Sequence, residues 1–371
     1  MKYKAAFPSQ YLQGKQLLQE LPDLMKSFGS NGLLFGSSSI KEKLLPRFAP
    51  ELPGQFRFEL FNRECSQTEV KRLYDFIRQN NIDILAGIGG GKAIDTAKIA
   101  ADLAGIPVIV VPTIASTDAP CSGCAVTYTT DGVFESVLYQ KRNPAAVVVD
   151  MDVIAAAPTR FLIAGMGDAL ATWFEARSCH QTKSVNECGG LCTLTGLHLA
   201  RLCYDTLLQY GVAAKTANEE HEVTPALNYV TEANILLSGI GFESGGLAAA
   251  HSVHNGLTAI PETHNYYHGE KVAFGVLTGL FLTDASQQEI EEVYAFCELI
   301  GLPTTLEQIG LDQTDPCDLL KAAEKVCAPG QPIHHEAGKI TPEKVLGAMN
   351  LADAMGRERK QSDHKPEGIY S

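Results

Sequence analysis

The sequence predicts an α/β domain with a parallel sheet over residues 1–155, followed by an all-helical domain over residues 156–371. Three observations support this fold class. The length of 371 residues exceeds what one hydrophobic core usually organises. Up to about Asp152, short apolar runs alternate with helical patterns, which is the rhythm of βαβ units. Beyond that point the strand signals end, and long helical stretches follow one another between Gly and Pro breakers.

Strands and helices alternate through the first half. "NGLLFGSSS" (31–39) predicts a strand and a turn, and "ECSQTEVKRLYDFIRQNN" (64–81) has apolar residues at helical spacing. "IDILAGIGGG" (82–91) reads as a buried strand that runs into glycines. "KAIDTAKIAADLAG" (92–105) reads as a helix that ends at Gly105, and "IPVIVVPT" (106–113) as the next strand.

Helical stretches dominate the second half, and the sequence predicts five of them: 159–178, 197–211, 226–256, 270–285 and 288–301. No run of 18 apolar residues occurs, so we expect no membrane span. The net charge of −13 argues against nucleic acid and anionic membranes as partners, because both attract basic surfaces. The first residues, "MKYKAAFPSQYLQGKQ", lack the apolar segment of a secretion signal, so a cytoplasmic protein is expected.

A glycine-rich turn, "GIGGGK" (87–92), joins a predicted strand to a predicted helix. Glycines let backbone N–H groups approach a phosphate, and a helix N-terminus favours its negative charge. Two common fingerprints fail, because Lys92 stands where G-x-G-x-x-G requires a glycine and Ala93 stands where a Walker A motif requires Ser or Thr. Phosphate binding and a simple tight turn both stay open.

A second polar loop, "PTIASTDAPCSG" (112–123), follows the next strand and carries Thr113, Ser116, Asp118 and Ser122. The carboxyl ends of adjacent parallel strands lie at one edge of a sheet, where ligands bind. A ligand role is one interpretation of this loop, and an ordinary hydrogen-bonded turn is the other.

Four of the ten histidines lie between residues 245 and 271, in "GGLAAAHSVHNGLTAIPETHNYYHGEK". His251 and His254 are three residues apart and share a helix face, whereas His268 opens the next helical stretch. Imidazoles from separate helices can converge on Zn²⁺ or Fe²⁺. The alternative is that these histidines are hydrogen-bonded core or surface residues.

A metal site of this kind needs one more protein ligand, and Asp168 is the best candidate. It stands in the mostly apolar stretch "LIAGMGDALATWFEA", where an unpaired buried carboxylate would be costly. Glu175 and Glu243 compete for the same role.

Five motifs together resemble a known family: "GIGGGKAIDTAK", "PTIASTDAPCS", "GMGDALATWFEA", "GFESGGLAAAHSVHNGLTAIPET" and "HGEKVAFG". They are similar to those of the glycerol dehydrogenases in the metal-dependent (iron-containing) alcohol dehydrogenase superfamily, in the same order and over nearly the whole chain. The resemblance implies a Rossmann-like dinucleotide-binding domain, a helical metal-binding domain and an active site in the cleft between them. It also implies that the protein oxidises glycerol, or a related small vicinal diol, to dihydroxyacetone by metal-assisted hydride transfer to NAD or NADP. The resemblance further implies a homo-oligomer, which in this family is commonly an octamer.

The resemblance also assigns residues. Asp168, His251 and His268 match the Zn²⁺ ligands, Asp118 matches the residue that contacts the polyol, and His254 falls near the nicotinamide and substrate. We expect these last two to orient the substrate and relay the proton. The positions that match cofactor contacts are Gly89, Gly90, Gly91, Lys92, Asp95, Thr113, Ser116, Ser122, Cys124 and Tyr128.

Some positions depart from the family pattern. Ser37 stands where an acidic residue usually holds the adenosine ribose, with Lys41 and Lys43 close by, so NADP is open beside NAD. Thr172 stands where many iron members carry a third histidine, which favours Zn²⁺ over Fe²⁺, as the usual affinity order also does. "SGCAVTY" and "IHHEAGKIT" differ from their common forms, and these differences bear on which alcohol fits.

Three alternative functions remain. The first is a reductase of another small substrate, namely a 2-oxo acid, an aldehyde or another diol, on the same scaffold. The second is a glycerol-1-phosphate dehydrogenase or a dehydroquinate synthase-like lyase, which would need cationic side chains near the metal, where Arg160 and Lys271 are the nearest. The third is a binding protein without activity.

Overall fold

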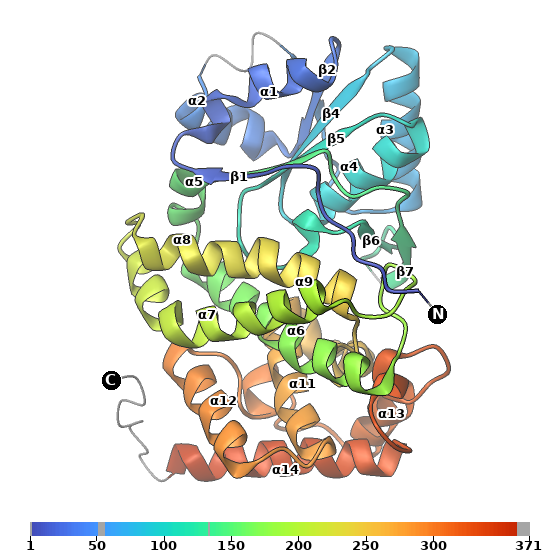
Figure 1. Ribbon diagram of the computed structural model, residues 1–371, viewed down its shortest axis with the longest axis vertical. Coiled ribbons are helices and arrows are strands. Elements are labelled where there is room, and N and C mark those ends of the chain that lie inside the picture. The colour runs from blue at the N-terminus through green and yellow to red at the C-terminus, as the bar shows by residue number, and fades with distance from the viewer. Residues whose placement is uncertain (1, 51–55, 133, 362–371) are drawn as a thin grey trace.

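A six-stranded parallel sheet forms the first half of the protein, and helices form most of the second half (Figure 1). The structure is a computed structural model that describes residues 2–50, 56–132 and 134–361. The predicted fold class is confirmed. The domain boundary between residues 155 and 156 stays a prediction.

All six strands of the sheet are parallel, in the order β1-β8-β5-β4-β2-β3. β2, β4, β5 and β8 are buried along their whole length, as expected for a sheet covered on both faces. The strands are β1 (Tyr11–Gly14), β2 (Gly32–Gly36), β3 (Arg57–Leu60), β4 (Ile84–Gly89), β5 (Val108–Pro112) and β8 (Ala146–Asp150).

The chain leaves β2 toward β3 but leaves β4 in the opposite direction, toward β5. The carboxyl ends of β2 and β4 therefore flank the switch point of the sheet, which is where open α/β sheets bind their ligands. The helices of this half are η1 (Leu17–Gln19), α1 (Leu21–Phe28), η2 (Ile40–Leu44), α2 (Leu45–Phe48), α3 (Gln67–Gln79), α4 (Gly91–Ala104), η4 (Ala119–Cys121) and α5 (Met151–Ala155). As predicted, α4 ends at Gly105, whose φ of 73° suits glycine.

A two-stranded antiparallel hairpin, β6 (Cys124–Tyr128) and β7 (Phe134–Tyr139), follows the second polar loop, in a stretch where the sequence predicted no strand. β7 is exposed at five of its six residues, so it lacks the apolar alternation by which a half-buried strand is recognised in a sequence.

The predicted helical stretches of the second half are present, but 226–256 is not one helix. It divides into α8 (Pro225–Glu232), a π-helical turn η5 (Ala233–Leu237), α9 (Ser238–Gly245) and α10 (Ala249–Leu257). The break lies at Gly246, whose φ of 114° is rarely open to other residues. The remaining helices are α6 (Thr159–Thr182), α7 (Leu194–Glu219), η6 (Pro261–Asn265), α11 (His268–Leu282), α12 (Gln287–Ile300), η7 (Glu307–Ile309), α13 (Pro316–Val326), η8 (Pro332–His335) and α14 (Pro342–Gln361).

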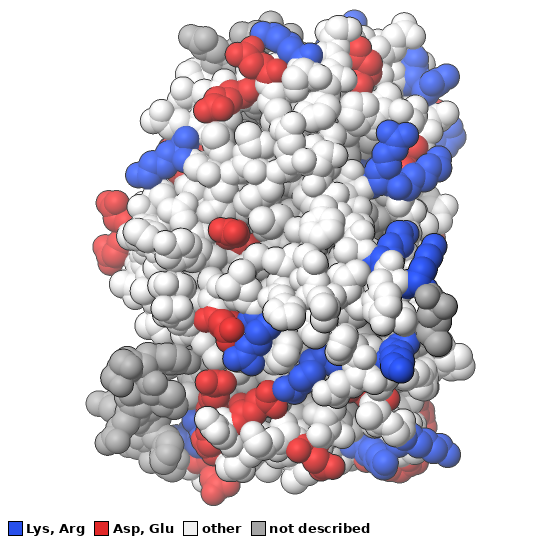
Figure 2. All heavy atoms as spheres, in the orientation of Figure 1, with Lys and Arg blue, Asp and Glu red and all other residues white. Residues whose placement is uncertain are grey.

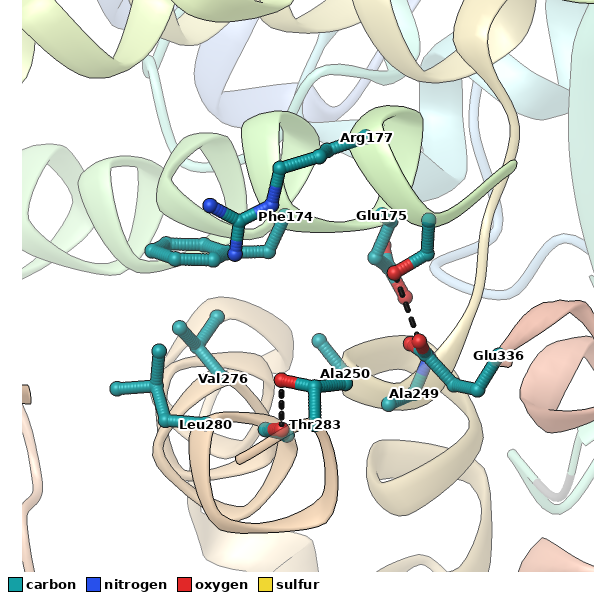
Figure 3. Close-up of a pocket in the computed structure, with 11 residues that line it drawn as sticks. Phe174, Glu175, Arg177, Ala249, Ala250, Val276, Leu280, Thr283 and Glu336 are labelled. Carbon is teal, nitrogen blue, oxygen red and sulfur yellow. Dashed lines mark hydrogen bonds between the residues drawn. The ribbon is translucent and has the colours of Figure 1, made fainter. Parts of the chain in front are cut away.

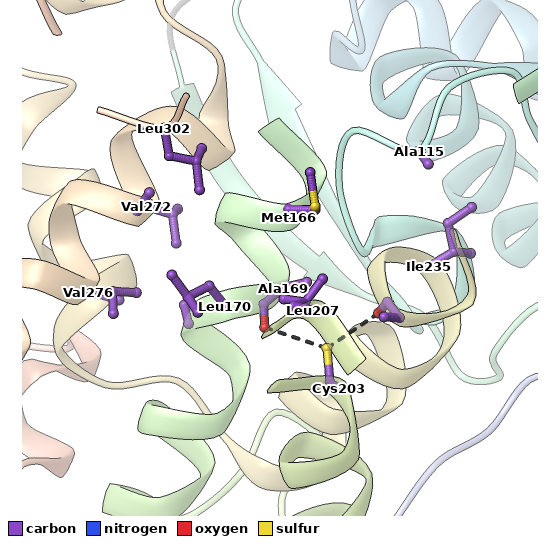
Figure 4. Close-up of a cluster of buried hydrophobic side chains, with 14 of the residues drawn as sticks. Ala115, Met166, Ala169, Leu170, Cys203, Leu207, Ile235, Val272, Val276 and Leu302 are labelled. Carbon is purple, nitrogen blue, oxygen red and sulfur yellow. Dashed lines mark hydrogen bonds between the residues drawn. The ribbon is translucent and has the colours of Figure 1, made fainter. Parts of the chain in front are cut away.

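One large cluster of buried apolar side chains continues from the sheet into the helices. Figure 4 shows part of it, where Leu170 of α6, Leu207 of α7 and Val272 of α11 lie close together. The thiol of Cys203 on α7 lies 3.6 Å from the carbonyl oxygen of Ala169 on α6. The helices that carry Asp168 and His268 therefore belong to one packed core.

Helix α11 packs against α6 and α10 at backbone distance, because glycines stand at the crossing points. A Cβ on Gly269 would lie 1.7 Å from the carbonyl oxygen of Ala164 in α6, and one on Gly275 would lie 2.3 Å from that of Ala250 in α10. The three helices that hold the candidate metal ligands are thereby fixed against one another.

Charged side chains form separate groups on the face shown in Figure 2, and no continuous basic surface is visible there. Within the described residues, no helix is long and apolar enough to cross a membrane.

Candidate active site

Three helices bring Asp168, His251 and His268 together, as the resemblance implied. Asp168 is fully buried in the middle of α6, His251 lies in the first turns of α10, and His268 is the first residue of α11. Their potential ligand atoms all lie within 4.8 Å of one another, and this is the only such group of metal-binding side chains in the part of the chain that the structure describes.

Both imidazoles face one carboxylate oxygen. His268 Nε2 lies 3.1 Å and His251 Nε2 3.5 Å from Asp168 Oδ1. That buried oxygen accepts no well-formed hydrogen bond among the described residues, whereas Oδ2 accepts one from the backbone N–H of Asp118 at 3.2 Å. A carboxylate oxygen and two imidazole nitrogens converging on one point fit the donor set of a divalent transition metal.

The other nitrogen of each imidazole has a side-chain partner. His251 Nδ1 lies 2.6 Å from Glu175 Oε2, and His268 Nδ1 lies 3.0 Å from His254 Nε2. Metal-binding histidines almost always have such a second partner, which orients the ring and leaves the opposite nitrogen for the metal. Both imidazoles are therefore arranged to present Nε2.

The pKa shifts show that the cluster stabilises positive charge next to Asp168. Burial alone would raise the pKa of Asp168, but the facing imidazoles of His268 and His251 outweigh it and hold that pKa well below its usual range. Burial would lower the pKa of His251, but Glu175 and Asp168 raise it well above its usual value. Burial and the neighbouring His268 lower the pKa of His254.

The two competing acidic residues, Glu175 and Glu243, have other partners. Glu243 accepts hydrogen bonds from the backbone N–H of Gly123 at 2.9 Å and from Asn143 Nδ2 at 2.5 Å. Glu175 contacts the far nitrogen of His251. His264, the fourth histidine of the cluster in the sequence, is exposed, with its Nε2 3.1 Å from the carbonyl oxygen of Thr258.

Asp118 lies directly beside the cluster and is buried. Its Oδ2 accepts a hydrogen bond from Ser238 Oγ at 2.8 Å, and Ser238 Oγ lies 2.8 Å from Thr172 Oγ1. Burial, together with the negative charge of Asp168, raises the pKa of Asp118 well above its usual range. Thr172 thus places a hydroxyl, rather than a third imidazole, on this side of α6.

The glycine-rich turn and the second polar loop lie side by side, because the backbone N–H of Thr113 donates to the carbonyl oxygen of Gly89 at 3.0 Å. Gly89 has a φ of 150°, and Gly90, the N-cap of α4, makes no side-chain capping bond. The first N–H groups of α4 are the donors that a helix leaves without internal partners. A turn of this kind can accept a pyrophosphate.

The other residues predicted to contact the cofactor differ in their solvent exposure and in their side-chain partners. Lys92 pairs with Glu64 at 2.7 Å, and its ammonium lies 4.8 Å from the ring centre of Tyr128. Asp95 is buried and accepts the N–H of Val126 at 2.9 Å. Ser122 is also buried, whereas the half-buried positions are Ser37, Gly90, Gly91, Thr113, Ser116, Cys124 and Tyr128.

Ser37 follows β2 directly, so it lies at the switch point of the sheet. Its Oγ is 3.4 Å from the backbone N of Ile40, and Lys41 lies over the ring of Phe58 at 5.6 Å. No acidic side chain follows β2 at this position.

The two cationic residues nearest the cluster in sequence have other partners. Arg160 forms a two-pronged contact with Glu270, at 2.7 and 2.9 Å. Lys271 is buried and its Nζ donates to the carbonyl oxygen of Thr263 at 3.2 Å.

Comparison with known proteins agrees with this geometry. The model of iron-containing alcohol dehydrogenases matches residues 8–151. A glycerol dehydrogenase from Thermotoga maritima is 50% identical over 356 residues, which cover 95% of this chain and 98% of that protein. The chain belongs to the iron-containing alcohol dehydrogenase family. A family member from Halobacterium salinarum, described as a glycolaldehyde reductase, is 43% identical over 94% of this chain and 97% of its own length.

A solved structure from the same family has the same fold. The crystal structure of a "probable glycerol dehydrogenase" from Sinorhizobium meliloti 1021 matches with a TM-score of 0.91 at 43% identity, covering 96% of this chain and 99% of that one.

Sequence reasoning missed the residues that surround the predicted ligands. Glu175 was considered only as a ligand, although its spacing of seven from Asp168 places both on one face of α6. Ser238 and the buried Lys98, whose Nζ donates to the carbonyl oxygen of Ala119 at 2.9 Å, were not singled out. The partner of Ser238, Asp118, is 120 residues away in the chain, so nothing in the local sequence indicates it. Lys98 also lies 3.6 Å from Asp95, three residues earlier on α4, and that helical spacing is a signal that could have indicated the pair.

Proposed function

We propose that the protein is an NAD(P)-dependent dehydrogenase that oxidises glycerol, or a related small vicinal diol, to dihydroxyacetone or the corresponding ketone. The observation that carries the proposal is the convergence of Asp168, His251 and His268 beside Asp118, which lies in the loop after β5 of the parallel sheet. The high identity to a glycerol dehydrogenase over nearly the full length of both chains supports it.

We propose that Asp168, His251 and His268 bind one divalent metal ion. A carboxylate and two imidazoles suit both Zn²⁺ and Fe²⁺, and the usual affinity order together with the hydroxyl of Thr172 favours Zn²⁺. Such an ion, when bound, supplies Lewis acidity that favours loss of the alcohol proton.

The remaining residues bind and orient the reactants. We propose that Gly89, Gly90 and Gly91 would hold the cofactor pyrophosphate at the N-terminus of α4, and a bound nicotinamide would supply the hydride acceptor. Asp118 and His254 orient the substrate and pass its proton on. Their positions support this, since the His254 ring lies 3.0 Å from that of His268, and Asp118 is held next to Asp168 by its own backbone N–H.

We propose that NADP is accepted beside NAD. An acidic side chain after β2 would repel a 2′-phosphate, whereas Ser37 carries no charge, and Lys41 and Lys43 are exposed on the turn that follows.

The experiment measures nicotinamide reduction by purified protein with glycerol and 1,2-propanediol, with NAD and with NADP. We expect activity with glycerol, loss of activity after chelation and recovery with Zn²⁺. Absence of reduction with either cofactor across both diols, in protein whose metal content has been verified, would contradict the proposal.

A second candidate is the reductive direction on a small aldehyde or 2-oxo acid. It is favoured by the 43% identity to a protein described as a glycolaldehyde reductase. Rates with glycolaldehyde and 2-oxobutyrate, measured as oxidation of the reduced cofactor, separate it from glycerol oxidation.

We further propose that the protein is a cytoplasmic homo-oligomer. All ten cysteines are unpaired thiols, which supports a reducing compartment. Leu194, Leu202 and Val212 on α7 and Tyr229 on α8 are exposed, and the area of these helices has few charges on the face in Figure 2. Sedimentation velocity decides the oligomeric state, including the octamer that the family resemblance implies.

A further inference from the structure

We propose that Glu175 is a positioning residue that fixes the tautomer of His251, and that metal binding at this site depends on it. The inference rests on the proposed metal site and adds a role for a residue outside the ligand set. Its basis is that two buried carboxylates, Glu175 and Glu336, both cap the N-terminus of helix α10, but only one of them also contacts His251.

Helix α10 begins without a capping side chain of its own, since Ala248 is the N-cap residue. Carboxylates from two distant segments replace the cap. Glu175 Oε1 accepts from the backbone N–H of Ala248 at 2.8 Å and from that of His251 at 2.9 Å, while Glu336 Oε1 accepts from Ala249 at 3.1 Å. Figure 3 shows Glu175, Glu336 and Ala249 around one small cavity. Negative charge at a helix N-terminus is favourable, so both acids fit this place.

The second oxygens of the two acids have different partners. Glu336 Oε2 accepts from the hydroxyl of Ser178 at 2.7 Å, whereas Glu175 Oε2 faces His251 Nδ1 at 2.6 Å. Glu175 is 1% exposed and Glu336 7%, so water does not substitute readily for either contact. Of these two acids, only Glu175 therefore contacts the side chain of a proposed metal ligand.

The contact dictates where the imidazole proton lies. A carboxylate can only accept, so Nδ1 of His251 must carry a hydrogen. In the neutral imidazole that binds a metal, Nε2, which faces Asp168 Oδ1 at 3.5 Å, then has its lone pair open to the cation. In the reverse tautomer Nε2 would carry the hydrogen and could not bind a metal.

Replacing Glu175 by glutamine keeps nearly the same side-chain shape but favours the opposite tautomer of His251. Its single carbonyl oxygen can serve the two N–H groups of Ala248 and His251, but the amide NH₂ then donates to Nδ1 and forces the hydrogen onto Nε2. If the amide is turned round, the NH₂ faces two backbone donors instead. Neither orientation satisfies the site.

Glu336→Gln is the matched control. It removes one carboxylate from the same helix end and at similar burial. Here the amide oxygen can still accept from Ala249, and the NH₂ can donate to the Ser178 hydroxyl, which accepts as well as donates, so both contacts can be kept. The control therefore reports the effect of lost charge and altered capping without any change at His251.

The measurement is the Zn²⁺ dissociation constant of the metal-stripped full-length chain, obtained by competition with a chromophoric chelator. We expect Glu175→Gln to bind Zn²⁺ about 10- to 100-fold more weakly, the usual range for the loss of a second partner, and Glu336→Gln to stay near wild type. The visible spectrum of bound Co²⁺ should change in Glu175→Gln and be retained in Glu336→Gln. Melting temperatures of the metal-stripped proteins show that both variants fold.

Unchanged Zn²⁺ affinity in Glu175→Gln, or an equal loss in the two variants, would overturn the proposal in favour of a capping or charge effect. His251→Ala separates this from failure of the metal site itself, because a variant that binds Zn²⁺ like wild type would remove His251 as a ligand. If Glu175→Gln does not fold, the ¹⁵N-histidine spectrum of Zn²⁺-loaded wild type decides the question. A hydrogen on Nδ1 of His251 supports the proposal, and a hydrogen on Nε2 overturns it.

Discussion

Replacing Gly269 by alanine tests whether the packing of α11 on α6 sets the geometry of the metal cluster. A Cβ at this position would lie 1.7 Å from the carbonyl oxygen of Ala164 and 3.0 Å from the backbone N of Asp168. The closest contact is with backbone, so no side-chain rotation relieves it. The two helices must separate by roughly 2 Å before the ordinary contact distance of about 3.5–4.0 Å returns.

This displacement has an effect on stability and an effect on the site. Overpacking of this kind costs about 1–3 kcal/mol, and each kcal/mol lowers the melting temperature of a large domain by about 2–4 °C. His268 is adjacent in sequence, and its Nε2 is only 3.1 Å from Asp168 Oδ1, so the separation moves the two side chains apart. A misplacement of about 1 Å can cost roughly 10²-fold in catalysis, and we expect a loss of that order in kcat/KM.

The assay combines thermal unfolding, Zn²⁺ affinity and kcat/KM for glycerol. Gly347→Ala is the control, because Gly347 is exposed in α14 and a Cβ there meets nothing within 4 Å. That variant should gain about 0.5–1 kcal/mol from the lower entropy of the unfolded chain and keep its metal affinity. Wild-type melting temperature and Zn²⁺ affinity in Gly269→Ala would refute the link between helix packing and the cluster.

Three further predictions follow from individual side chains. Asp168→Asn should abolish metal retention while cofactor binding persists, as measured by elemental analysis and nucleotide titration; full metal content would show that the ligand assignment is wrong. Ser37→Asp should shift the ratio of kcat/KM toward NAD, and an unchanged ratio removes Ser37 from the account of cofactor choice. Burial would raise the pKa of Glu69, but its hydrogen bonds to Arg72 and Asn62 outweigh burial and lower that pKa. The stability that this carboxylate contributes is therefore present above its unfolded pKa of about 4.3 and is lost as the pH falls through its folded pKa. Glu69→Gln should therefore cost about 1.5–3 kcal/mol at pH 7 in urea unfolding, with the difference shrinking below about pH 4; a cost that does not change with pH would contradict this.

The sequence predicted the elements whose signals are local. Buried strands such as β4 and β5 are continuous apolar runs, and α4 ends at a glycine that adopts the left-handed conformation. The β6–β7 hairpin was missed because β7 is exposed and shows no alternation. The break at Gly246 was missed because glycine also occurs inside helices. Only the structure shows that this glycine has a φ of 114° and that a Cβ there would lie 2.6 Å from Cys179 Sγ.

The candidate site was predictable as a set of residue types but not as a network. The structure brings Asp168, His251 and His268 together, and the resemblance had named these three positions. It does not follow from the sequence that His254 contacts His268, because that depends on the path of the chain between residues 258 and 267. The contact of Glu336 with the start of α10 joins segments that are 87 residues apart, so no local sequence pattern could predict it.

The most direct test of the central claim is an anomalous difference map from crystals of the protein grown with Zn²⁺, recorded at the zinc absorption edge. The account predicts one peak per chain, about 2.0–2.2 Å from an oxygen of Asp168 and from Nε2 of both His251 and His268. A map with no peak between these three side chains, in crystals that bind Zn²⁺ elsewhere on the chain, would contradict it.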